Sequence, residues 1–144
     1  MMKNKLSKVL IALPLCFITS CSASQNESMV VFKCHANEPT SIDVVITEAG
    51  GTYQLEQFNT AELKLANIGL VNDVRKLSYH RSLVTEHSIV FAHDDNEITV
   101  SDYYSEEFDT VTKEKSVTLQ KNNSKKYWIC DSTAISTLAS IEDF

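Results

Sequence analysis

The sequence predicts a mainly β domain, an antiparallel meander that forms a small closed or nearly closed barrel and carries a short C-terminal helix. Three observations lead to this fold class. Apolar and polar residues alternate with period two over several segments, which is typical of strands with one buried face. Turn residues separate these segments into pairs, as in hairpins. A cysteine also stands at the end of both the first and the last expected strand.

The first half of the domain contains an initial strand and one hairpin. Residues 29–34 form a compact segment that is rich in β-branched and aromatic side chains. Residues 42–47 and 53–56 alternate between apolar and polar. Gly50 and Gly51 lie between these two segments and can adopt the positive φ angles that a tight hairpin turn requires. We therefore expect residues 42–56 to form a hairpin.

The second half repeats this pattern twice. Residues 87–92 and 98–104 predict a second hairpin around the turn residues 93–96. The alternating segment 117–120 and the segment 127–130, separated by Lys-Asn-Asn-Ser, predict a third hairpin.

Two segments are less regular. Residues 60–80 fit either strands or a short helix that begins at Thr60, and we favour a strand or an irregular crossing. Near the C-terminus, Asp131 can cap a helix, although β-branched residues between Thr133 and Thr137 weaken the helix propensity there. The side chains expected on one face of this helix are Ala134, Ile135, Leu138 and Ile141.

The N-terminus has the features of a bacterial secretory signal. Three lysines precede an apolar run over residues 9–18, which is too short to span a membrane as a helix. The run ends in Ile18-Thr19-Ser20-Cys21, which resembles the lipobox of bacterial lipoproteins. This resemblance implies cleavage before Cys21 and attachment of lipid to Cys21. The alternative is an ordinary signal peptide with a chance cysteine.

The expected organisation is a signal peptide over residues 1–20, a lipidated tether over 21–28 and a single β domain over 29–144. The tether is small and polar, and seven extended residues reach about 25 Å at most, so the domain would stay close to the bilayer. Ser22, which follows the cysteine, resembles the pattern that directs lipoproteins to the outer membrane. We therefore expect a lipid-anchored protein on the periplasmic face of that membrane.

Charge narrows the range of partners. The chain has a net charge of −6, and loss of the three lysines in residues 1–20 would leave −9. Such a chain lacks the excess of basic residues that a nucleic-acid-binding protein needs. A basic protein of the cell envelope is an electrostatically easier partner.

The cysteines predict one disulfide. Cys16 would leave with the signal peptide and Cys21 would carry lipid, so Cys34 and Cys130 remain. In an oxidising compartment two such thiols suggest a bridge, which here would join the first and last strands. The alternative is two buried free cysteines. Metal binding is not expected, since no C-x-x-C pair and no histidine pair at i, i+4 accompanies them.

Candidate chemistry is sparse. No nucleophile elbow, phosphate-binding loop or zinc-binding helix motif occurs, so we expect neither an enzyme nor a cofactor. The histidines, His35, His80, His87 and His93, are expected to be structural or to face solvent. Trp128 could stack on a ligand, but because it lies two residues before Cys130 we expect its side chain to be buried in the core.

One acidic stretch is the candidate binding surface. Three interpretations stay open: a calcium site, a surface that docks a basic protein, or a solvated hairpin end. Its residues do not follow the ligand order of the helix–loop–helix calcium motif. The acidic residues are Asp94, Asp95, Glu97, Asp102, Glu106, Glu107 and Asp109.

The lipobox, the short tether, the aromatic residue two positions before Cys34 and the closing Cys130 together resemble the membrane-bound inhibitors of c-type lysozyme. That resemblance implies a small barrel of about eight strands and a periplasmic protein partner. The S-A-S-G-x-[KR]-Y segment of those inhibitors has no counterpart here, and Ser22-Ala23-Ser24 lies in the tether. No inhibitory residue is therefore assigned.

These observations predict a lipid-anchored envelope lipoprotein that acts as a non-catalytic binding or envelope-support module. The alternative is a lysozyme-inhibitor-like protein with a divergent inhibitory loop.

Overall fold

The computed structural model describes residues 27–68 and 74–141. The predicted signal peptide, Cys21 and most of the tether lie outside the described residues. Within the described residues, no helix has the length and apolar character needed to cross a membrane.

The described residues form ten strands in two antiparallel sheets of five strands each. The first sheet has the order β10-β1-β2-β3-β4 and the second the order β5-β6-β7-β8-β9. The strands of the first sheet are β1 (Met29–Ala36), β2 (Ile42–Ala49), β3 (Thr52–Thr60), β4 (Lys64–Ile68) and β10 (Ile135–Ser136). Those of the second sheet are β5 (Val74–Arg81), β6 (Val84–His93), β7 (Asn96–Glu107), β8 (Thr110–Lys121) and β9 (Ser124–Ile129).

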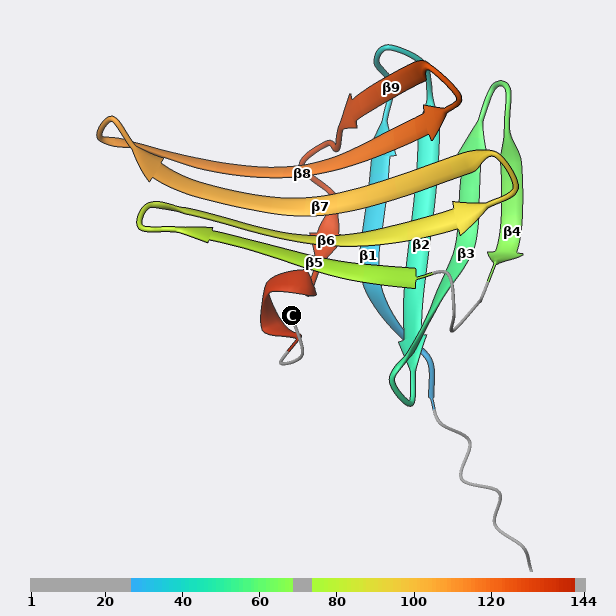
Figure 1. Ribbon diagram of the computed structural model, residues 1–144, viewed down its shortest axis with the longest axis horizontal. Helices are drawn as coiled ribbons and strands as arrows, with labels where there is room; N and C mark the ends of the chain where they lie inside the picture. The colour runs from blue at the N-terminus through green and yellow to red at the C-terminus, as the bar shows by residue number, and fades with distance from the viewer. Residues whose placement is uncertain (1–26, 69–73, 142–144) are drawn as a thin grey trace, which may run out of the picture.

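The two sheets pack face to face, and the strands of the second sheet run across those of the first (Figure 1). The predicted mainly β, antiparallel fold is thus confirmed. The prediction of a closed barrel was wrong, because no described strand of one sheet pairs with a strand of the other. The free edge of β1 is occupied by β10, through the pairs Phe32–Ser136 and Lys33–Ile135, and cannot accept β9. The result is an open sandwich with crossed sheets.

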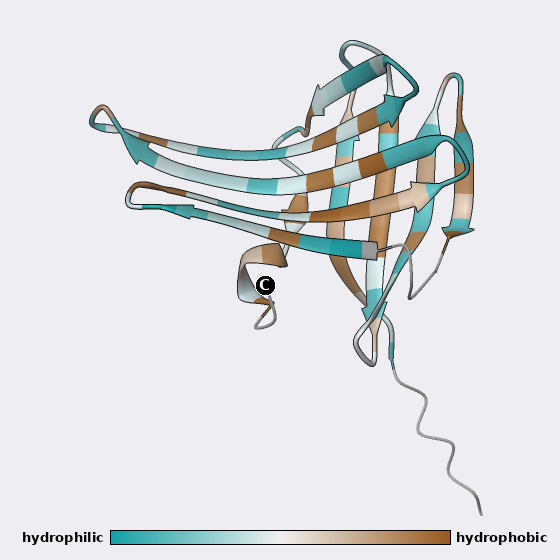
Figure 2. Ribbon diagram, in the orientation of Figure 1, coloured by the Kyte–Doolittle hydropathy of each residue, from teal (hydrophilic) through white to brown (hydrophobic). Residues whose placement is uncertain are grey.

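The core lies where the sheets cross. Alternate residues of the first sheet, such as Ile42, Val44 and Ile46, are fully buried against the inner face of the second, as the period-two pattern predicts. The hydrophobic parts of β6 and β7 lie over the first sheet, whereas their far ends project beyond it and are mostly hydrophilic (Figure 2). The first sheet does not cover this projecting end of the second sheet (Figure 1).

The predicted disulfide between Cys34 and Cys130 is present, with the two Cα atoms 5.2 Å apart. It joins β1 of the first sheet to the residue that follows β9 of the second. Two backbone hydrogen bonds continue this connection, because the Cys130 amide donates to the Lys115 carbonyl and the Asp131 amide to the His35 carbonyl. The bridge therefore links two crossed sheets rather than the two edges of one barrel.

Trp128 belongs to the core, as its position predicts. Its ring is buried, and its Nε1 donates a hydrogen bond of 2.8 Å to the carbonyl of Thr40. The indole thus closes one end of the sandwich and satisfies its single donor.

The prediction of a C-terminal helix was wrong. Residues 135–136 form the short strand β10, and only a 3-10 turn, η1 (Leu138–Ser140), follows. Two β-branched residues, Thr133 and Ile135, lie in the segment that would have begun the helix, and they favour an extended backbone. Leu138 is nevertheless fully buried as expected, because η1 contacts β6 and β7.

The three predicted hairpins are confirmed, and the segment 60–80 contains the strands β4 and β5. Gly50 and Gly51 adopt φ angles of 59° and 82° in the β2–β3 turn. A further hairpin, β7–β8, was not predicted. Its turn consists of Phe108 and Asp109, and a phenylalanine is not a turn signal.

Candidate functional site

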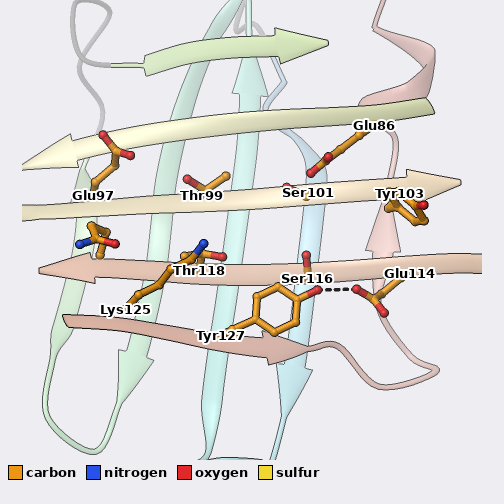
Figure 3. Close-up of a pocket in the computed structure, with 11 residues that line it drawn as sticks. Glu86, Glu97, Thr99, Ser101, Tyr103, Glu114, Ser116, Thr118, Lys125 and Tyr127 are labelled. Carbon is orange, nitrogen blue, oxygen red and sulfur yellow. Dashed lines mark hydrogen bonds between the residues drawn. The ribbon is translucent and has the colours of Figure 1, made fainter. Parts of the chain in front are cut away.

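A polar groove crosses the outer face of the second sheet, on the side away from the first sheet (Figure 3). Its residues alternate along β7 and β8 with the core residues Ile98, Val100, Val117 and Leu119, so they point outward. The groove encloses about 480 Å³. The register of the strands arranges its side chains in rows that run from strand to strand.

The floor is a row of serines. Ser101 of β7 and Ser116 of β8 line the groove, and Ser88 of β6 continues their row on the other side of Ser101. All three are buried although they belong to the outward face, because larger side chains stand in the rows on both sides. The Ser88 and Ser101 hydroxyls are hydrogen-bonded at 2.7 Å. The short side chains therefore create the hollow, and their hydroxyls give it a polar floor.

One wall alternates carboxylates with aromatic rings. Glu86, Tyr103 and Glu114 are opposite one another on β6, β7 and β8. The Tyr127 hydroxyl, from β9, donates a hydrogen bond to Glu114 (Figure 3). Burial, followed by this bond, raises the pKa of Tyr127, so the hydroxyl keeps its proton and acts as a donor. Among the described residues neither Glu86 nor Glu114 forms an ion pair.

The other wall is also polar. Thr99 and Thr118 form a cross-strand pair, and beyond them lie Glu97 and Lys125. Glu97 pairs with Arg75 of β5 at 2.6 Å. The groove lining thus contains three carboxylates and one lysine, and Arg75 already pairs with one of the carboxylates, so Glu86 and Glu114 carry the remaining negative charge. This balance favours a ligand that carries positive charge.

The chemistry of the groove is set by its hydroxyls, carboxylates and aromatic rings. Its hydroxyls lack a neighbouring histidine, because none of the described residues that line it is a histidine. A serine nucleophile needs such a base within hydrogen-bond reach. Hydroxyls, carboxylates and exposed aromatic rings on a rigid sheet instead provide hydrogen bonds and flat contact surfaces.

The histidines occupy three separate places. His35 pairs with Asp43 at 2.8 Å, and the hydrogen bond between them raises the pKa of His35. The rings of His80 and His87 meet edge to face, with centroids 5.9 Å apart, on β5 and β6. His93 lies 3.5 Å from Asp94 in the β6–β7 turn. Over the ranges 27–68 and 74–141, no three His, Cys, Asp or Glu side chains converge as metal ligands.

The structure does not gather the predicted acidic residues into one surface. Asp94 and Asp95 lie in the β6–β7 turn, whereas Glu106, Glu107 and Asp109 lie at the opposite end of β7, roughly 35 Å away for a strand of twelve residues. Asp102 lies two residues after the core residue Val100 and so on the same, inner face of β7, opposite Lys115 of β8. Only Glu97 of the predicted set lines the groove.

Sequence reasoning missed the other groove residues. The signal was present in the polar face of β7 and β8, where Thr99 and Ser101 alternate with one set of core residues and Ser116 and Thr118 with another. Only the pairing register places these hydroxyls side by side, and register cannot be read from one strand alone.

Comparison with known proteins finds no matching protein family, no matching curated protein and no matching solved structure.

Proposed function

We propose that this protein is a lipid-anchored lipoprotein of the outer membrane, facing the periplasm, and that it acts as a non-catalytic binding module. Its ligand is a basic protein of the envelope, which presents cationic side chains to the outer face of the second sheet. The observation that carries the proposal is the groove with its buried serine floor and with two carboxylates, Glu86 and Glu114, that form no ion pair among the described residues.

The charge of the wall supports a cationic ligand. Glu86 and Glu114 flank the Tyr103 ring from the two neighbouring strands. A lysine or arginine side chain that reached this row would meet two carboxylates and an aromatic ring, and both kinds of group attract cations. The tether predicted from the sequence would keep this surface close to the membrane, where the partner must also be found.

The proposal can be tested by photo-crosslinking in cells that make the full-length chain. A photoreactive amino acid at Thr118 of the groove is compared with the same amino acid at Lys64, which is exposed on β4 of the first sheet. We expect a discrete adduct with a basic envelope protein from position 118 and none from position 64. Absence of an adduct at position 118, or identical adducts at both positions, would refute the proposal.

The excess of carboxylates also favours a second candidate, inhibition of a lysozyme, because c-type lysozymes are basic proteins. Its test uses the purified protein at low salt with c-type and g-type lysozymes. If the protein neither binds nor slows any of them, this second candidate fails, whereas the binding proposal stands or falls on the crosslinking result.

A further inference from the structure

The most exposed large apolar side chain of the described residues is Phe108, which is 95% exposed. It stands at the tip of the β7–β8 hairpin, whose strands are twelve residues long and project beyond the first sheet (Figure 1). The other exposed large apolar side chains lie between 39% and 59%. Neither the core nor the groove accounts for Phe108.

The backbone at Phe108 is unfavourable for a phenylalanine. Its φ is 57°, in the left-handed region that bulky residues rarely adopt. The first turn position of the two other hairpins of β7 and β8 also has a positive φ, but Asp94 and Asn122 occupy it there. These short polar residues tolerate that conformation. The backbone conformation of Phe108 therefore lowers the stability of the fold, and its exposed ring gains no compensating packing. Strained residues of this kind are found at ligand-contacting sites.

Acidic residues outnumber basic ones around Phe108. Glu106, Glu107 and Asp109 lie within two residues of it, and of these three only Glu107 forms an ion pair among the described residues, with Arg81 of β5. The nearest lysine in the sequence, Lys113, lies over the Tyr104 ring, with its Nζ 5.7 Å from the ring centroid. Tyr104 donates a hydrogen bond to Glu106 and so fixes that carboxylate near the tip. The β5–β6 turn lies beside this end, because the Glu106 amide donates to the Leu83 carbonyl at 2.9 Å. Leu83 is half exposed and extends the apolar contact.

We propose that the β7–β8 tip is a second docking surface, in which Phe108 enters an apolar pocket of a basic protein and Glu106 and Asp109 meet the cationic rim of that pocket. An exposed aromatic anchor that enters a pocket is the usual energetic centre of a protein interface. The acidic rim selects against a membrane with anionic lipids and favours a basic protein surface. This surface is separate from the groove, since the tip lies five residues beyond Tyr103 along β7.

The first experiment places a photoreactive phenylalanine derivative at position 108 of the full-length chain, in cells. An adduct with one basic protein supports the proposal only if the purified pair also binds with the dependence on Phe108 described below. An adduct with lipid, with a second copy of this chain or with an acidic protein overturns it, and so does the absence of an adduct. The result does not depend on crosslinking from the groove position.

The second experiment measures affinity between the purified full-length lipoprotein in detergent and the identified protein. Phe108→Asn should weaken binding at least about tenfold, the loss typical of an aromatic anchor. Its melting temperature should not fall, since asparagine suits the backbone. Ile135→Asn, which changes an apolar residue that is 48% exposed on β10, is the matched control and should bind like the wild type. Equal affinity of Phe108→Asn and the wild type would overturn the proposal.

Salt provides an independent readout. Asp109→Asn should weaken binding less than Phe108→Asn does and should reduce the dependence of affinity on ionic strength. A wild-type affinity that is unchanged between low and high salt would show that the acidic rim has no role and would overturn the assignment of a basic partner.

Discussion

Phe108 and Asn122 occupy the same position in two hairpins that share strand β8, and both have a φ of more than 50°. The two residues differ in what that backbone costs. A left-handed conformation is unfavourable by roughly 1–2 kcal/mol for most side chains and much less for asparagine. Phe108 therefore lowers the stability of the folded protein and places an exposed aromatic ring at the tip.

The difference between the two side chains predicts that exchanging them changes the free energy of unfolding in opposite directions at the two turns. Phe108→Asn should raise the free energy of unfolding by about 1 kcal/mol, and Asn122→Phe should lower it by a similar amount. Chemical denaturation of the two variants and the wild type measures both changes. A loss of stability in Phe108→Asn would mean that the ring packs on the fold and that its exposure has another cause.

His35 and Asp43 predict a pH dependence. Their hydrogen bond raises the pKa of His35 in the folded protein, so the contribution of this pair is fully present below the ordinary histidine pKa of about 6.5. It is lost as pH rises through the raised value. Asp43→Asn should therefore lower the melting temperature more at pH 5.5 than at pH 8.5. An equal decrease at both values would contradict the assignment.

At the scale of elements, the sequence is informative where local chemistry decides the structure. Gly50 and Gly51 could be recognised because only glycine adopts their φ angles freely. Trp128 could be placed in the core from its neighbours. The β7–β8 turn could not be predicted, because Phe108 opposes the local preference that sequence reasoning uses. The C-terminal segment was misassigned because the residues of one helix face, Leu138 among them, also suit a short strand followed by a 3-10 turn.

The disulfide belongs to this scale because it links two elements of different sheets. It closes a loop with a sequence separation of 96 residues. For such a loop, the chain-entropy model gives a stabilisation of about 4.7 kcal/mol as an upper value. The Cys34→Ala, Cys130→Ala double variant should lose up to about 4 kcal/mol of unfolding free energy in denaturant, and reduction of the wild type should have a similar effect. A loss below about 1 kcal/mol would indicate that the crossed sheets hold together without the bridge.

At the scale of the whole molecule, the position and the antiparallel pairing of most strands were predictable, but their number and the closure of the sheet were not. Alternation shows which residues face inward, yet it does not show which strand occupies the edge of β1. The two residues of β10 take that edge and leave two crossed sheets. The groove follows from this arrangement, because the second sheet has an outer face that the first sheet does not cover. For the same reason the groove residues could not be identified before the register was known.

The proposed lipid anchor at Cys21 can be tested in the full-length chain. Cys21→Ser should abolish metabolic labelling with a fatty acid and should release the protein from the membrane fraction, because a thiol is the attachment point in a lipoprotein signal. Cys16→Ser is the matched control and should leave labelling and fractionation unchanged. Labelling that persists in Cys21→Ser would exclude the proposed anchor.

The central claim is that the carboxylates of the groove bind a cationic partner. The most direct measurement is the yield of the adduct from a photoreactive residue at Thr118, compared between the otherwise unchanged chain and a variant with Glu86→Gln and Glu114→Gln. Glu38→Gln, at an exposed position outside the groove, serves as the control. We predict that the double substitution reduces the yield at least about fivefold, since each charge-assisted hydrogen bond contributes roughly 1.5–3 kcal/mol, and that the control does not. Equal yields from all three chains would contradict the account.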